Sequence, residues 1–164
     1  MIERFCVRLN GKRVEAEIDS RALLIEAVRD CGAKGARIGC LTGDCGACSL
    51  ELDGRLAKSC LVLAVSAEGS DIVTIEGSRH AIARELQATF VTCNGFQCGY
   101  CTSGMIMVAI DLLRANASPT EAEIRHAISG NLCRCTGYED IVRAVGQAAD
   151  ALRDKSTERN EKED

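Results

Sequence analysis

Eleven cysteines lie in this chain of 164 residues, and they constrain its fold more than any other feature. An odd number cannot pair completely into disulfides, and the opening Met1 to Arg4 shows no secretory signal. Cytosolic thiols stay reduced and are available as thiolate ligands for metal. Only two Tyr, three Phe and no Trp are present, so aromatic packing cannot supply the core. A metal centre that ties loops together would supply stability that small domains lack.

The first group of cysteines has four members: Cys40, Cys45, Cys48 and Cys60. The first three have the spacing of plant-type 2Fe–2S ferredoxins, in which one short loop wraps a cluster. Gly39, Gly43 and Gly46 permit the positive φ angles and the close backbone approach that such a loop needs. A turn at Asp53-Gly54 would bring back the fourth ligand. Structural zinc sites prefer closely spaced pairs at both ends, so this loop favours iron–sulfur over zinc.

The second group also has four members: Cys98, Cys101, Cys133 and Cys135. Taken alone, two short cysteine pairs could equally hold zinc. The first pair, however, lies at the start of a helix predicted around Met105, and the second pair precedes the last predicted helix. Helix N-termini stabilise anionic groups, so this context favours a tetrathiolate 2Fe–2S cluster.

Hydrophobic periodicity divides the chain into two halves. The first half predicts hairpin strands on either side of Asn10-Gly11, a helix over 23–31, a strand over 49–52, a short helix over 61–65 and a strand over 71–75. Together these elements predict a compact mixed sheet packed on one helix.

The second half predicts four helices, which form a small bundle. Their apolar faces run over 82–93 and 141–152, the segment 105–113 is apolar nearly all round, and Ser118 to Glu123 resembles a helix start with a capping box. We therefore predict an α+β chain with a mixed domain over residues 1–77 and a helical domain over 78–152. The charged residues 153–164 are predicted to form a disordered tail.

Composition excludes several classes of protein. The net charge of −4 argues against a nucleic-acid surface, and the apolar run from Met105 to Ile110 is too short to cross a bilayer. We expect a cytoplasmic location, with membrane association or export only through a partner subunit. No Ser/His/Asp arrangement, phosphate loop or carboxylate pair is present, so this chain alone should catalyse no substrate chemistry.

The two cysteine groups in this order resemble the small iron–sulfur subunit of the xanthine oxidase family of molybdenum hydroxylases. The resemblance covers about residues 3–150 and is greatest to the stand-alone small subunits of bacterial three-part enzymes, such as carbon monoxide dehydrogenase and the N-heterocycle oxidoreductases. The matching stretches are Gly39 to Cys48, Leu52 to Cys60, Gln97 to Thr102 and Gly130 to Tyr138.

The resemblance implies an N-terminal β-grasp 2Fe–2S ferredoxin-like domain and a C-terminal four-helix 2Fe–2S binding domain. It also implies that electrons from a molybdenum–pterin centre on a large subunit pass through the C-terminal and then the N-terminal cluster to FAD on a medium subunit. The subunits would assemble as a dimer of heterotrimers. By the same resemblance, Gln97 and Cys135 contact the pterin. The substrate, whether carbon monoxide, an aldehyde, a purine or another N-heterocycle, depends on the large subunit.

The chain departs from the family at two places. Ser103 stands where many members carry proline, and Leu41-Thr42 where many carry more polar residues or glycine. The first change should affect a helix start but not metal ligation. The second could change solvent access to the first cluster.

Other candidates have simpler interpretations. Three cysteines outside the groups, Cys6, Cys31 and Cys93, are predicted to be packing residues. Tyr100 is predicted to pack at a helix start, and His80 and His126 to lie at the surface. Arg134 is equally consistent with tuning cluster charge and with partner contact. Two functions compete with the electron-transfer subunit: a free ferredoxin-like carrier and a zinc-stapled interaction module.

Overall fold

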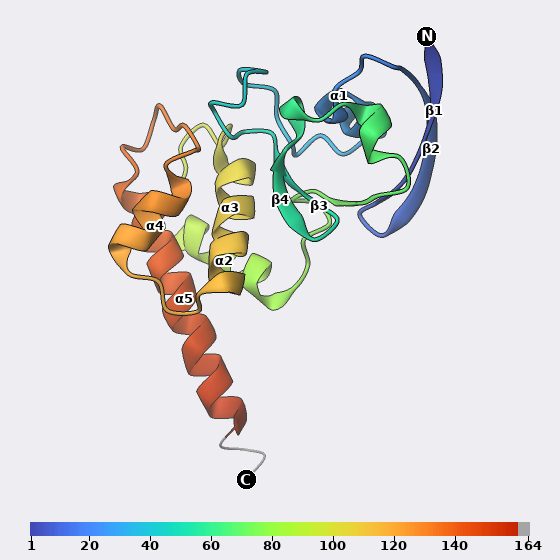
Figure 1. The fold of residues 1–164 in the computed structure, drawn as a ribbon. Coiled ribbons are helices and arrows are strands. Elements are labelled where there is room, and N and C mark those ends of the chain that lie inside the picture. Colours follow the sequence, from blue (N-terminus) through green and yellow to red (C-terminus); the bar gives the residue numbers. More distant parts are fainter. Residues whose placement is uncertain (161–164) are drawn as a thin grey trace.

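The computed structural model describes residues 1–160 and shows a mixed sheet beside a group of helices (Figure 1). The helices and strands in this range are β1 (Ile2–Leu9), β2 (Lys12–Asp19), α1 (Leu24–Asp30), β3 (Ser49–Leu52), β4 (Arg55–Lys58), β5 (Asp71–Val73), α2 (Ala81–Thr92), α3 (Thr102–Ala115), α4 (Glu121–Ile128) and α5 (Glu139–Asn160). This mixed α/β composition, with four helices after residue 80, agrees with the sequence prediction.

The sheet has the strand order β2-β1-β5-β3-β4, with β1 and β5 parallel and the other neighbours antiparallel. Its two hairpins are closed by two-residue turns, Asn10-Gly11 and Asp53-Gly54, in which both residues have positive φ. Such turns match the right-handed twist of the strands, which is why these dipeptides favour hairpins. Both turns were predicted from the sequence.

Buried apolar side chains form two main clusters. One lies between the sheet and α1 and includes Phe5, Val28 and Leu50. The other lies among α2, α3, α4 and α5 and includes Phe90 and Met105. Helix α3, which belongs to the second cluster, also contacts β3 and β4, so it joins the helices to the sheet (Figure 1). The division of the chain into domains near residue 77 remains a prediction.

The predicted short helix over 61–65 is absent. Two 3₁₀ turns, Ser59–Leu61 and Ala64–Ala67, lie on either side of an extended segment instead. The amide of Leu24 donates to the carbonyl of Val62 at 2.8 Å, and Leu63 forms a bridge with Leu23. Pairing with this distant backbone holds the segment extended.

The predicted disordered tail over 153–164 is wrong for the part that the structure describes, because α5 continues to Asn160. Arg153 forms an ion pair with Asp150, three residues earlier, at 2.8 Å. Lys155 forms an ion pair with Glu85 on α2, which holds the extended helix against its neighbour. The prediction of disorder relied on the lack of apolar residues in this segment. Ion pairs within α5 and between α5 and α2 support the helix there instead. Residues 161–164 of that prediction lie outside the described residues.

Within residues 1–160, no helix is long and apolar enough to cross a membrane.

Candidate metal centres

The first cysteine loop connects α1 to β3 through irregular backbone. Leu41, Gly43 and Gly46 have positive φ, and a Cβ at Gly46 would lie 1.9 Å from the side-chain oxygen of Asn131. Only glycine therefore fits at this approach. The loop directs backbone amides toward a sulfur: the amides of Thr42 and Cys45 donate to Cys40 Sγ at 3.3 and 3.4 Å. Hydrogen bonds from Thr42 and from the Cys45 amide lower the pKa of the Cys40 thiol to about 6.

The other end of the first group is buried. Cys48 lies just before β3, and Cys60 lies in the first 3₁₀ turn. Ser59 fixes the turn, because its hydroxyl donates to the carbonyl of Cys48 at 2.7 Å. Burial, followed by the hydrogen bond with Cys48 and weaker repulsion from Cys40, raises the pKa of Cys60 to about 11. Cys60 therefore lies close enough to Cys48 and Cys40 to be affected by them, and Cys45 lies against Cys40.

The second group also forms two pairs. Cys98 and Cys135 are exposed, with their sulfurs 3.6 Å apart. Cys101 precedes α3 and pairs with Cys133, and burial with this contact raises the pKa of Cys101 to about 12. The amide and hydroxyl of Thr136 lie 3.5 and 3.1 Å from Cys133 Sγ. Burial opposes ionisation of Cys133, but these contacts with Thr136 give it a lowered pKa.

This paired arrangement fits a binuclear cluster. In the part of the chain that the structure describes, no three His, Cys, Asp or Glu side chains surround a position for a single metal ion. A 2Fe–2S cluster takes two protein ligands on each of its irons, so two pairs of thiols suit it. The buried hydroxyls of Thr102 and Ser103, directly after Cys101, have no hydrogen-bond partner among the described residues.

The two cysteine loops touch each other. The amide of Leu132 donates to the carbonyl of Cys45 at 2.9 Å, so the residue before Cys133 contacts a member of the first group directly. The hydroxyl of Tyr100 donates to the carbonyl of Ile38 at 2.6 Å. Tyr100 was predicted only to pack at the start of a helix, whereas it connects the two loops. No sequence pattern indicated these contacts.

Gln97 and Cys135 lie together at the surface. The side-chain amide of Gln97 donates to the carbonyl of Cys135 at 3.2 Å, and both residues are exposed. The two residues for which a pterin contact was predicted are thus in contact with each other at the surface. Arg134, between the two ligand candidates, is exposed as well.

The ungrouped cysteines have different surroundings. Cys93 is buried as predicted, and its Sγ lies 2.9 Å from Gln147 Oε1. Cys31, at the end of α1, is half-buried and packs against the cluster beside the sheet. The packing prediction is wrong for Cys6, which alternates with the buried Phe5 and therefore points to the other face of the sheet.

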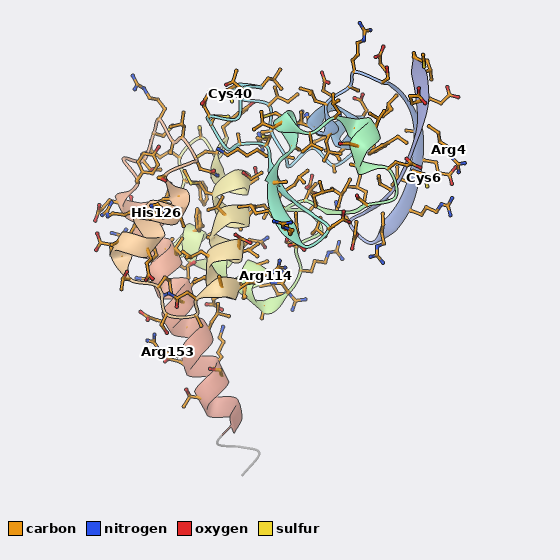
Figure 2. The ribbon with its side chains drawn as sticks, in the orientation of Figure 1. Arg4, Cys6, Cys40, Arg114, His126 and Arg153 are labelled. Atoms are coloured by element: carbon orange, nitrogen blue, oxygen red, sulfur yellow. The ribbon has the colours of Figure 1, made fainter. Side chains whose placement is uncertain are left out.

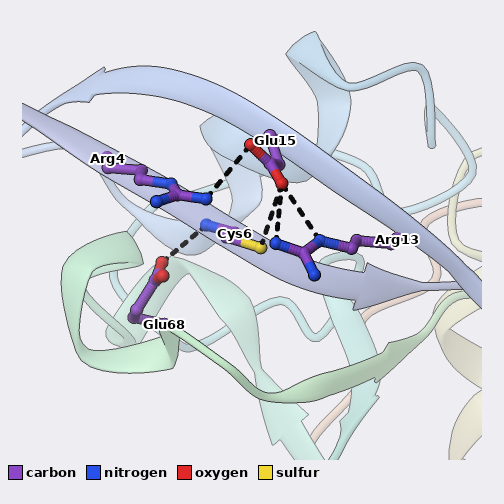
Figure 3. Close-up of polar contacts among 5 residues, drawn as sticks. All are labelled: Arg4, Cys6, Arg13, Glu15 and Glu68. Carbon is purple, nitrogen blue, oxygen red and sulfur yellow. Dashed lines mark hydrogen bonds and ion pairs between the residues drawn. The ribbon is translucent and has the colours of Figure 1, made fainter.

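Figure 3 shows the polar surroundings of Cys6. Its Sγ lies 3.9 Å from a carboxylate oxygen of Glu15, which also pairs with Arg4 and Arg13. The amide of Cys6 donates to Glu68 at 2.5 Å. Apart from Glu68, which follows the second 3₁₀ turn, these residues lie on β1 and β2, and the labelled Cys6 and Cys40 are well separated in Figure 2.

The two histidines lie outside both groups. His126, on α4, is exposed as predicted (Figure 2). His80 is half-buried, and its Nδ1 accepts a hydrogen bond from the amide of Ala83 at 3.3 Å, so it caps α2. The cap could have been predicted from the sequence, because His80 directly precedes the helical pattern of α2.

Comparison with known proteins defines the class of this chain. Residues 74–146 match the family described as the 2Fe-2S binding domain. The chain is 42% identical over 151 residues to the nicotine 6-hydroxylase small subunit of Paenarthrobacter nicotinovorans, with 92% of each protein covered. It is 44% identical over 142 residues to caffeine dehydrogenase subunit gamma of Pseudomonas sp. strain CBB1, covering 84% of this chain and 85% of the relative.

A solved structure, quinoline 2-oxidoreductase from Pseudomonas putida 86, contains a chain with a TM-score of 0.85 and 41% identity. The match covers 93% of this chain and 96% of that chain. By fold and sequence, then, this is a 2Fe–2S binding protein. It belongs to the small iron–sulfur subunits of the xanthine oxidase family of molybdenum hydroxylases, which confirms the resemblance carried by the cysteine motifs.

Proposed function

We propose that this chain is the electron-transfer subunit of a molybdenum hydroxylase, carrying single electrons from a molybdenum–pterin centre on a large subunit through two 2Fe–2S clusters to FAD on a medium subunit. The observation that carries the proposal is the contact between the two cysteine loops, Leu132 N–H to Cys45 O at 2.9 Å. Two adjacent groups of paired thiols suit a relay. The subunit names of the relatives support assembly with other chains.

In this proposal each cysteine group holds one cluster. The proposed ligands are Cys40, Cys45, Cys48 and Cys60 for the first, and Cys98, Cys101, Cys133 and Cys135 for the second. When bound, such clusters accept and release one electron at a time. The protein contributes amide donors to Cys40 and Cys133 and buries Cys48 and Cys60 away from water. Both features tune the charge and solvation of a cluster.

Electrons would enter and leave at exposed faces of the chain. Gln97 and Cys135 are the proposed pterin contacts, and their shared exposure supports that role. Around the first group, Leu41, Leu61 and Leu63 are 44%, 63% and 47% exposed. Large apolar side chains gathered at a surface favour burial by another subunit. We place the medium subunit over this face.

The substrate would be bound by the large subunit. The names of the relatives refer to nicotine and caffeine, and those chains match this one at 42% and 44% identity. The two identities are nearly equal although the names differ, so this similarity does not indicate which substrate the assembled enzyme takes. We propose no catalytic residue in this chain.

Low-temperature EPR of the dithionite-reduced protein, with iron and zinc measured on the same sample, tests the proposal. Two distinct S = 1/2 signals and about four irons per chain are expected. Zinc without an EPR signal would overturn the relay and leave a structural module. Copurification with two larger subunits is the second expected result, whereas a lone monomer that reduces diverse acceptors would indicate a free carrier.

A further inference from the structure

Lys58 occupies a fixed position between the two cysteine loops. It is the last residue of β4, and it is paired in register with Ser49, the residue after Cys48. It also lies two positions before Cys60. Its side chain is half-buried, so strand pairing and packing both restrict where its ammonium can lie.

The ammonium of Lys58 joins the loops through backbone carbonyls. Its Nζ donates to the carbonyl of Gly43 at 2.5 Å, inside the segment between Cys40 and Cys45. It also donates to the carbonyl of Gly130 at 3.2 Å, shortly before Cys133. One cation therefore contacts both loops.

No carboxylate neutralises this cation among the described residues, because Lys58 takes part in none of their ion pairs. The nearest acidic neighbour in sequence to Gly43 is Asp44, which instead accepts a hydrogen bond from Thr42. Carbonyl dipoles bind an ammonium without cancelling its charge. The positive charge of Lys58 is thus left to act on whatever the cysteines hold.

That charge has a defined effect on a 2Fe–2S cluster. Four thiolates and two sulfides outweigh two ferric ions, so the cluster is anionic, and each added electron increases its negative charge. A nearby fixed positive charge stabilises the reduced form more than the oxidised form, and it acts more strongly where water is excluded. Its presence therefore raises the reduction potential.

We propose that Lys58 is a positioning and tuning residue of the relay: its ammonium holds the two cysteine loops together and raises the reduction potential of the cluster bound by the first group, with a smaller effect on the second. The inference rests on the proposed function. Without the Lys58 ammonium, the first cluster would be harder to reduce, and electrons would pass less readily from the cluster of the second group to that of the first.

Potentiometric EPR titration of the isolated enzyme complex tests this role. Lys58→Gln keeps a hydrogen-bond donor but removes the charge, Lys58→Met removes both, and Lys58→Arg keeps both. Lys12→Gln removes an exposed charge from β2, at the opposite edge of the sheet from β4. The signal of the first cluster is assigned by its loss in Cys45→Ser.

The expected result is a lower midpoint potential for the first cluster in Lys58→Gln and Lys58→Met, with both EPR line shapes retained. Lys58→Arg and Lys12→Gln should match the wild type. Unchanged potentials in the two neutral variants would overturn the proposal, as would equal falls in Lys58→Gln and Lys58→Arg, which would assign the effect to packing. Absence of both signals from the wild type would instead overturn the proposed function.

Discussion

Neighbouring thiols and backbone amide donors distinguish the grouped cysteines from Cys31. Cys40 accepts backbone amides, and Cys98 and Cys135 face one another, so these sulfurs lie next to hydrogen-bond donors or a second thiol. Among residues 1–160, Cys31 has no such neighbour, and burial together with the charge of Asp30 raises the pKa of its thiol. Burial raises the pKa of the proposed ligands Cys60 and Cys101 as well, so it is the neighbouring thiol, and not the pKa, that separates them from Cys31.

Replacement of one cysteine from each class tests this distinction. Cys45→Ser removes a proposed ligand, so we expect loss of one EPR signal and of about two of the four irons per chain. Cys31→Ser is the matched control and should keep both signals. Retention of both signals in Cys45→Ser would contradict the ligand assignment. Loss of both would show that the two clusters do not assemble independently.

His80 should make stability depend on pH. Burial first, and then the Arg114 guanidinium, hold the pKa of His80 below its ordinary value of 6.5, while Glu51 partly opposes the shift. The unfolded chain therefore binds a proton more readily, so the free energy of unfolding is highest above pH 6.5 and falls as the pH drops through 6.5 toward the folded-state value. The cap on α2 requires an unprotonated Nδ1, which agrees with this sign.

Denaturation of the wild type, His80→Asn and His126→Asn between about pH 7 and pH 5.5 measures the effect. Asparagine is a favourable N-cap without a charge in this range, so His80→Asn should lose this pH dependence and remain folded. His126→Asn replaces the exposed histidine and should behave as the wild type. Equal slopes for all three proteins would contradict the role assigned to His80.

At the scale of elements, helix starts were predictable because their signals are local. The sequence around Thr120 and Glu123 predicted a capping box, and the structure shows both of its hydrogen bonds before α4. The end of α5 was not predictable in this way. Its last described turns depend on Lys155 reaching Glu85 on α2, a partner 70 positions away. Local periodicity carries no information about such a partner.

Two helical glycines provide a prediction at this scale. A Cβ at Gly104 in α3 would lie 2.3 Å from the carbonyl oxygen of Gly46, whereas a Cβ at Gly146 in α5 would meet only Ile124, at 3.9 Å. Gly104→Ala must push α3 away from the first cysteine loop, so we expect a loss of about 1–3 kcal/mol in unfolding free energy. Gly146→Ala should instead gain about 0.5–1 kcal/mol, because alanine favours the helix.

Urea denaturation of the two variants measures both changes on one scale. Stabilisation by Gly104→Ala would contradict the close contact between α3 and the loop. A lower unfolding free energy for Gly146→Ala would show that this part of α5 is more crowded than the structure indicates.

At the scale of the whole molecule, the sequence predicted which cysteines belong together but not how the two groups meet. Ligand spacing is local, so each group could be recognised from its loop. The contact between Asn131 and Gly46 joins residues 85 positions apart, and no local pattern in the sequence predicts it. Lys58 was missed for the same reason, because its two carbonyl partners come from different loops.

Asn131 should couple the unfolding of the two hydrophobic clusters. It is 2% exposed, and its side-chain amide donates to the Gly46 carbonyl at 3.4 Å, across the junction of the two cysteine loops. That carbonyl also accepts from Ser49, so Asn131→Ala removes one hydrogen bond and leaves a small void, at a cost of about 1–2 kcal/mol. Because this hydrogen bond lies where the two cysteine loops meet, calorimetry of Asn131→Ala should show a broadened or divided transition. Asn116→Ala, at the end of α3, should keep a single transition. A single, unshifted transition in Asn131→Ala would mean that the packing of α3 on β3 and β4 alone makes the molecule unfold as one unit.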